Sequence, residues 1–142
     1  MEETESFPTP SSDEKTLAML AHVLQVVSWF IAPLVILLIK RESKFVRFHA
    51  LQVLLLHLLY IAVFVALMCL FFVLAIGSLP AGDARGAPPP FFFGSVFALW
   101  CGMGTVWVLM IVLAIVYGIR AGRGEWAPYP IVGRWALRLA GN

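Results

Sequence analysis

Three long stretches of the chain contain no Asp, Glu, Lys or Arg, and this feature limits the possible folds more than any other. The stretches run over residues 16–39, 48–79 and 91–119, and together they hold more than half of the 142 residues. A helix needs about 20 mostly apolar residues to cross a bilayer, so each stretch is long enough to do so. The sequence therefore predicts an all-α fold, a polytopic helical bundle in a membrane.

The composition argues against a water-soluble enzyme. Hydrophobic residues make up 61% of the chain and charged residues 13%, whereas a soluble domain usually carries about a quarter charged residues. Cys69 and Cys101 both lie in apolar stretches and lack the paired spacing of a zinc site. P-loop, dinucleotide-binding and serine-nucleophile motifs are missing from the sequence. We therefore expect no enzymatic activity, no cofactor, no metal and no nucleic-acid partner.

The polar ends of the chain flank one predicted helical domain. Residues 1–12 are polar and acidic and contain two prolines, so they bury too little apolar area to offset the entropy cost of ordering. We expect them to form a disordered tail. Asp13 and Glu14 follow a pair of serines, an arrangement that favours the start of a helix. A single helical membrane domain is predicted over residues 13–138, with a short tail over 139–142.

A proline interrupts the first apolar stretch. Pro33 lacks the backbone N–H that a helix interior uses, and its ring clashes with the preceding turn, so a break is expected near Ala32. Two structures satisfy this pattern: one broken membrane span, or two short helices that form a re-entrant hairpin. We prefer the broken span, which gives three spans in total, because it is the simpler arrangement.

Basic residues are distributed unevenly between the connections, and this predicts the orientation. The 40–47 connection and the tail after residue 119 hold eight of the ten Lys and Arg residues, whereas the 80–90 loop holds one. Cytoplasmic loops are enriched in Lys and Arg. We therefore expect a multi-pass protein of a bacterial inner membrane, with residues 40–47 and the C-terminus in the cytoplasm. The N-terminal tail lies outside if the first stretch crosses once, and inside if it forms a hairpin.

Polar side chains inside the apolar stretches are the candidate functional residues, because they are costly to place in a bilayer. His22 and Gln25 are three residues apart and share one face of the first predicted helix. His49, Gln52 and His57 fall within an arc of about 140° on the second. If these faces meet, they form a polar seam with two alternative roles. Interhelical hydrogen bonds, worth about 0.6 kcal/mol each, would fix the packing; alternatively, the seam would bind a cofactor or a small molecule.

The end of the chain predicts a short interfacial helix. Trp135 and Leu139 fall on one side of this helix, and Arg134 and Arg138 lie near each other on another. Such a helix suits the membrane interface, with its arginines at the lipid headgroups. The simpler role for this helix is that of a membrane anchor, and the alternative role is that of a docking surface for a partner.

The tail is also expected to fold back under the bundle. The start of the second apolar helix and the tail both flank a cytoplasmic membrane boundary, where aromatic and basic groups are favoured. We predict that Trp126 or Tyr129 packs near His49, with Glu125 available to an arginine such as Arg47. The alternative is that the two segments are anchored independently to the lipid headgroups. A candidate interfacial docking surface then comprises Arg47, Glu125, Trp126, Tyr129 and Pro130.

Three segments of the sequence carry a family resemblance: DEKTLAMLAH at 13–22, APLVILLIKRESKFVRFHALQ at 32–52 and GIRAGRGEWAPYPIVGRWALR at 118–138. Together they resemble the bacterial relatives of the twenty-kilodalton membrane subunit of the chloroplast inner-envelope protein translocon. The resemblance implies a small helical membrane protein with three or four membrane segments and no known enzymatic activity. The chain departs from these similar sequences at His57, where they tend to carry glutamine, and in a shortened link around Pro33.

Two functional hypotheses follow. The resemblance implies a small non-catalytic integral membrane protein, a component of protein translocation or envelope assembly. Its expected partners are the lipid bilayer and either other membrane-protein subunits or further copies of the chain. The alternative is a cofactor- or small-molecule-binding membrane protein that uses the polar seam.

Overall fold

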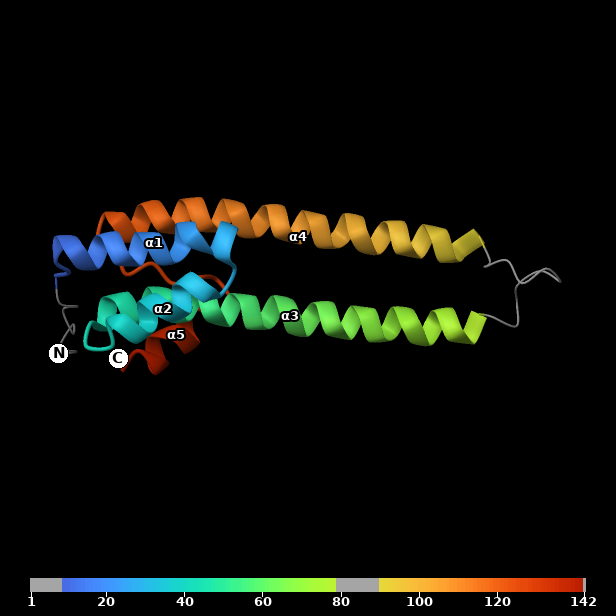
Figure 1. Cartoon of the computed structure of the whole chain (residues 1–142), viewed down its shortest axis with the longest axis horizontal. Helices are drawn as coiled ribbons and strands as arrows, with labels where there is room; N and C mark the ends of the chain where they lie inside the picture. Colours follow the sequence, from blue (N-terminus) through green and yellow to red (C-terminus); the bar gives the residue numbers. More distant parts are fainter. Residues whose placement is uncertain (1–8, 79–89, 142) are drawn as a thin grey trace, which may run out of the picture. The chain divides into compact units, whose positions relative to one another are not determined.

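In the computed structural model, which describes residues 9–78 and 90–141, every regular element is a helix (Figure 1). The helices are α1 (Ser12–Ser28), α2 (Ile31–Ile39), α3 (Lys44–Ser78), α4 (Pro90–Gly122) and α5 (Gly133–Leu139). The prediction of an all-α fold is confirmed for this part of the chain. Most of the predicted N-terminal tail and nearly all of the 80–90 loop lie outside the described residues.

The first apolar stretch forms a hairpin of two helices. The chain leaves α1 at Trp29, whose φ of 56° lies in the left-handed region, and α2 packs back against α1 (Figure 1). The Ser28 hydroxyl accepts a hydrogen bond from the Ala32 N–H at 3.3 Å and so satisfies a free donor at the start of α2. The break therefore precedes the predicted position, because Pro33 is tolerated in the first turn of a helix.

The prediction of three spans is not confirmed. Within the described ranges, two helical segments are long and apolar enough to cross a membrane, Lys44–Gly77 and Phe92–Gly122. The helices α1 and α2 have 17 and 9 residues, fewer than the roughly 20 that a span needs. The hairpin, which was the alternative to one broken span, describes this stretch.

The helix α3 begins inside the basic connection. The Ser43 hydroxyl accepts a hydrogen bond from the Val46 N–H at 3.2 Å, as a residue at a helix start commonly does. The helix therefore begins at Lys44, four residues before the predicted start of the apolar segment at residue 48, and it includes Arg47. The side chains of both residues belong to the first turn of a long helix rather than to a loop.

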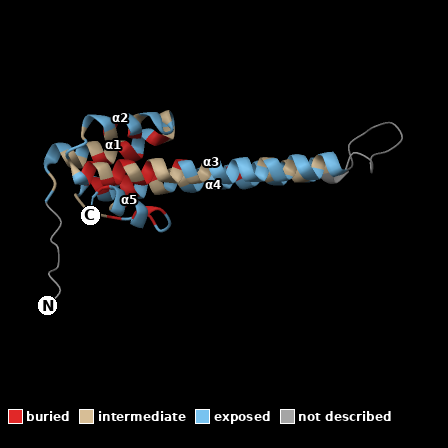
Figure 2. Ribbon diagram, turned by 90° about the horizontal axis from the view of Figure 1, so that it is seen from below, coloured by how far each residue is buried: buried red, intermediate tan, exposed pale blue. Residues whose placement is uncertain are grey.

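The described residues fall into two compact units, and the first consists of those within Met1–Leu58 and Ile111–Asn142. Its core contains small side chains where helices touch: Ala18 of α1 packs with Phe45 of α3 and Ala121 of α4. Small residues allow helix backbones to approach closely. Figure 2 shows that the buried residues gather in this unit. The fold thus provides one region where polar side chains can be enclosed.

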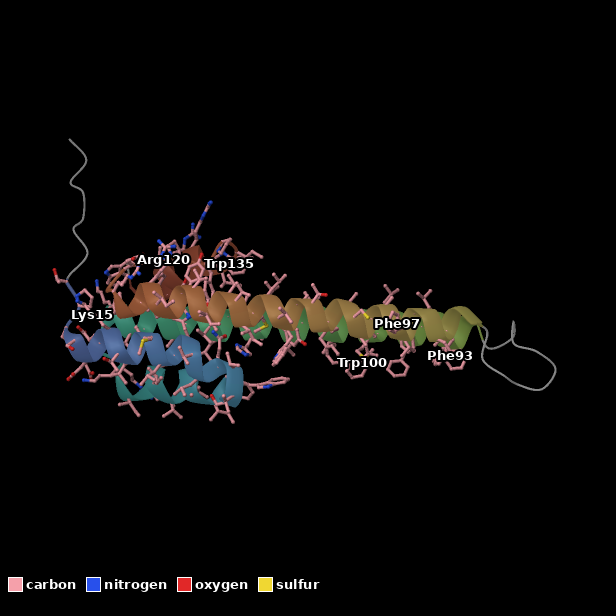
Figure 3. All side chains as sticks on the ribbon, turned by 90° about the horizontal axis from the view of Figure 1, so that it is seen from above. Lys15, Phe93, Phe97, Trp100, Arg120 and Trp135 are labelled. Atoms are coloured by element: carbon pink, nitrogen blue, oxygen red, sulfur yellow. The ribbon has the colours of Figure 1, made fainter. Side chains whose placement is uncertain are left out.

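The second unit, Leu59–Met110, contains the rest of α3 and α4. The rings of Phe71 and Phe92 are 5.5 Å apart there. Most other side chains are apolar and exposed, and Phe97 and Trp100 project outward from α4 (Figure 3). An exposed apolar surface of this size is typical of helices that contact lipid.

Candidate functional site

A buried chain of hydrogen bonds links three segments of the first unit. The ring Nε2 of His22 on α1 lies 3.0 Å from Nδ1 of His49 on α3, and both side chains are fully buried. Nδ1 of His22 lies 2.8 Å from the Tyr129 hydroxyl, and Nε2 of His49 lies 3.1 Å from the backbone carbonyl oxygen of Glu125. All four ring nitrogens therefore have a protein partner.

The direction of these hydrogen bonds follows from one backbone oxygen. The Glu125 carbonyl can only accept, so Nε2 of His49 donates to it. A neutral imidazole has one N–H, so Nδ1 of His49 accepts, and Nε2 of His22 must donate to it. Nδ1 of His22 then accepts from the Tyr129 hydroxyl. Two neutral histidines thus connect Tyr129 to Glu125 with a donor and an acceptor at every step.

Gln52 fixes the same part of the tail through its backbone. Its amide nitrogen donates to the Ala127 carbonyl oxygen at 3.2 Å, and its amide oxygen accepts from the Tyr129 N–H. Pro128 and Pro130 flank Tyr129 and have no N–H, so Tyr129 supplies the one backbone donor of this Pro-Tyr-Pro segment. The side chain of Gln52 therefore forms one donated and one accepted hydrogen bond with the tail backbone, as a neighbouring β-strand would.

Gln25 is buried beside this network without joining it. Neither of its amide atoms has a hydrogen-bond partner. Burial raises the pKa of Tyr129 above its ordinary value; the Gln25 amide lies near that hydroxyl and opposes the effect, although the two form no hydrogen bond of normal geometry. Tyr129 stays protonated at neutral pH, as its role as donor to His22 requires.

His57 takes no part in the network. It is buried, and its Nδ1 donates to the Val53 carbonyl oxygen of its own helix at 3.0 Å. The expected seam therefore divides: His22, His49 and Gln52 are joined through the tail, whereas His57 is satisfied locally. Helical spacing could not reveal this, because a histidine can find an acceptor one turn back on the same helix.

The tail folds back against α3, and Glu125 pairs with an arginine other than the suggested Arg47. Its carboxylate accepts a hydrogen bond from Nε of Arg120 at 2.7 Å, and its N–H donates to the Arg120 carbonyl. Arg47 instead donates from Nη2 to the Leu139 carbonyl oxygen at 3.0 Å, at the end of α5. Glu125 thus pairs with an arginine, as predicted, but this arginine is Arg120 and not the suggested Arg47, because the turn after α4 brings Glu125 back to Arg120.

Most of the remaining docking candidates face the interior of the unit. The Trp126 ring lies 5.2 Å from the Phe45 ring and 5.4 Å from the Phe48 ring, measured between centroids. Tyr129 is buried, and Pro130 is exposed. Trp126 and Tyr129 therefore hold the tail in place.

Tyr117 of α4 is a member of the site that the sequence reasoning missed. Its ring centroid lies 4.4 Å from that of Tyr129, edge to face, and 6.4 Å from that of His22. A signal was present: Tyr117 is the last aromatic residue of the third apolar stretch, three residues before Arg120, whose guanidinium lies 5.6 Å from its ring. Such a spacing places both side chains on one helix face.

The geometry favours a structural use of the imidazoles over ligand binding. Within the described residues, no three His, Cys, Asp or Glu side chains are grouped closely enough to hold a metal ion. His22 and His49 could offer nitrogen ligands only if their hydrogen bonds to Tyr129, to Glu125 or to each other were broken. The arrangement joins α1, α3 and the tail.

Residues 13–136 match the model of the magnetosome magnetite crystal formation protein family (MamF/MmsF). This match corrects the family inferred from the three segments, which was that of the chloroplast translocon subunit. Those segments are apolar helix ends with basic and aromatic flanks, features that small membrane proteins of different families can share. No curated protein and no solved structure matches the chain. The matched family and the apolar helices show that the chain is a membrane protein.

Proposed function

This chain belongs to the magnetosome magnetite crystal formation protein family, and we propose that it is a small, non-catalytic membrane component of magnetite crystal formation. The observation that carries the proposal is the extent of the match. It runs over residues 13–136 and so includes both long apolar helices and the hydrogen-bonded site. The match gives no support to the roles in protein translocation or envelope assembly that the translocon resemblance implied.

The pairing of the buried polar groups supports a non-catalytic role. Tyr129, His22, His49 and the Glu125 carbonyl satisfy one another in sequence. Buried polar networks whose members are all satisfied make a packed region rigid and unique. We place the working part of the protein in the first unit, where this network holds the tail in a fixed shape beside α1 and α3.

The orientation that we propose puts this unit on the cytoplasmic side of the membrane. The hairpin brings the start of α1 next to the 40–43 turn: Glu14, Lys40 and Ser43 line one pocket, and the Ser43 side chain lowers the pKa of the Glu14 carboxyl. Arg47 in turn contacts the end of α5. The basic 40–47 connection and the basic tail thus belong to one unit, which the excess of Lys and Arg in cytoplasmic segments favours for that side.

Deletion and complementation of the gene test this function. In a magnetite-forming bacterium that carries it, electron microscopy of the deletion strain should show crystals of altered size, shape or number. The full chain supplied in trans should restore them. Wild-type crystals in the deletion strain would contradict the proposal. Metal or chromophore bound stoichiometrically to the purified protein would favour the alternative, a cofactor-binding protein.

A further inference from the structure

A cavity of about 490 Å³ opens on the first unit between the end of α2, the start of α3 and the end of α5. Its lining combines two kinds of side chain, aliphatic and cationic, and contains no acidic residue. The lining residues are Leu37, Leu38, Arg41, Arg47, Leu51 and Leu139.

The two arginines present a cationic wall. Arg47 is half-buried and held in place, because its Nη2 donates to the Leu139 carbonyl oxygen, a free acceptor in the last turn of α5. Its guanidinium has five N–H groups in a planar fork, and the structure assigns one of them to this carbonyl. Arg41 is exposed and makes no hydrogen bond or ion pair with another described residue. The remaining donors fit a phosphate, which guanidinium groups bind with two parallel hydrogen bonds.

The leucines provide an apolar wall that water would cover poorly. Leu38 is 49% exposed and Leu139 is 55% exposed. The surface beside them is also apolar, since Ile39 of α2 and Trp135 of α5 are exposed. An occupant that meets both walls carries an anionic group joined to a long hydrocarbon, as a phospholipid does.

We propose that this cavity binds an anionic phospholipid. The phosphate lies between Arg41 and Arg47, and one acyl chain lies along the leucines. Both arginines favour a headgroup with net negative charge, because a choline or ammonium group beside them would be repelled. The flanking residues Lys40 and Lys44 outnumber the one acidic neighbour, Glu42, so the field around the cavity stays positive. The lipid would bridge the helical hairpin and α5.

Native mass spectrometry of the full chain in detergent tests this proposal. Phosphatidylglycerol and phosphatidylcholine with identical acyl chains are added at equal concentrations, and the fraction of protein that retains each lipid is measured. We expect preferential retention of phosphatidylglycerol. Arg41→Gln should weaken that binding about fivefold, the effect of one basic group near a charged lipid surface. Because Arg41 is exposed and unpaired, this variant leaves the fold intact.

The matched control is Arg134→Gln, which removes an exposed arginine of α5 outside the cavity lining. It should bind phosphatidylglycerol as the unmodified chain does. Equal retention of the two lipids, or equal losses in the two variants, would overturn the proposal. Displacement of phosphatidylglycerol by millimolar inorganic phosphate would overturn it too, because it would identify a site for the free ion instead. A third result would also overturn the proposal: a protein that copurifies with the unmodified chain but not with Arg41→Gln. Such a protein would be the occupant of the cavity in place of a lipid.

Discussion

At the scale of single residues, the first unit pairs polar groups that are costly to bury alone. A buried donor or acceptor that loses its partner costs about 1–3 kcal/mol. His22 and His49 avoid this cost because each ring nitrogen meets a group of the opposite kind, from the Tyr129 hydroxyl to the Glu125 carbonyl. The tail is therefore bound to α1 and α3 by side chains from all three segments.

Tyr129→Phe should lower the free energy of unfolding in detergent by about 1–3 kcal/mol, because Nδ1 of His22 then stays buried without a donor. Thermal or denaturant-induced unfolding of the purified protein measures this. Tyr60→Phe removes the same hydroxyl at a half-buried position of α3 for which the structure gives no hydrogen bond. That control should unfold as the unmodified chain does.

The same network predicts that Tyr129→Phe and His49→Ala are not additive. Residues of one hydrogen-bonded chain share their coupling energy, so the double variant should lose less stability than the sum of the single losses. Strictly additive losses would show that the tyrosine and the second histidine act separately.

The sequence located these residues better than it located their partners. Helical spacing placed His22 on one face and His49 with Gln52 on another, and these faces do meet. It could not show that His57 is satisfied by a carbonyl of its own helix, since that depends on a side-chain rotamer. Nor could it pair Glu125 with Arg120, which depends on the turn after α4.

At the scale of elements, the ends of the helices decide the fold of the first unit. Pro33 correctly predicted a break in the first apolar stretch but placed it near Ala32, a few residues too late. The break comes at Trp29, directly after Ser28, whose hydroxyl accepts a hydrogen bond from the Ala32 N–H at the start of α2. A proline shows where a helix can begin as well as where one must end.

The junction between the tail and α5 is tightly packed at Gly133. A Cβ added there would lie 2.7 Å and 2.8 Å from two backbone atoms of Pro128. Backbone cannot move aside as a flexible side chain can, so Gly133→Ala should cost about 1–3 kcal/mol of unfolding free energy. Gly104→Ala is the control, because a Cβ there meets nothing within 4 Å and alanine favours a helix. Unfolding in detergent should separate the two variants; equal stability would contradict the packing.

The start of α1 predicts a dependence of stability on pH. The nearby Ser43 side chain and the backbone N–H of Ser11, which donates to the Glu14 carboxylate, lower the pKa of this group below its ordinary value of 4.5. A lowered pKa in the folded state means that the carboxylate stabilises the fold above about pH 4.5 and loses this effect as the pH falls through the lowered value. Glu14→Gln should therefore be less stable than the unmodified chain at pH 7. The difference should shrink in unfolding measurements as the pH falls through the lowered pKa, and a difference that grows on acidification would contradict this.

At the scale of the whole molecule, the sequence predicted the membrane class and the helices but not the number of spans. Charge-free stretches identify apolar helices reliably, because no soluble chain of this size can hide them. Whether a stretch crosses once or returns depends on one left-handed residue, Trp29, and tryptophan carries no sequence signal for that conformation. Hence the three predicted spans became two candidate spans and a hairpin.

Reporter fusions test the proposed orientation. Fusions after Gly82 and Gly141 should report opposite sides of the membrane, with Gly141 in the cytoplasm, because the tail carries four arginines and the 80–90 loop one. A reporter that fluoresces only in the cytoplasm and one that is active only outside should give complementary signals. Activity of the outside reporter alone at Gly141 would reverse the orientation.

The most direct test of the account compares crystals in cells whose only copy of the chain is overpacked at the tail junction with crystals in cells that carry a control variant. The gene-deletion strain is complemented with Gly133→Ala or Gly104→Ala, at matched amounts of membrane-inserted protein, and crystal dimensions are measured by electron microscopy. If the folded first unit supports magnetite crystal formation, Gly104→Ala restores the crystals and Gly133→Ala does not. Full restoration by Gly133→Ala, with its tail shown to be displaced, would contradict the account.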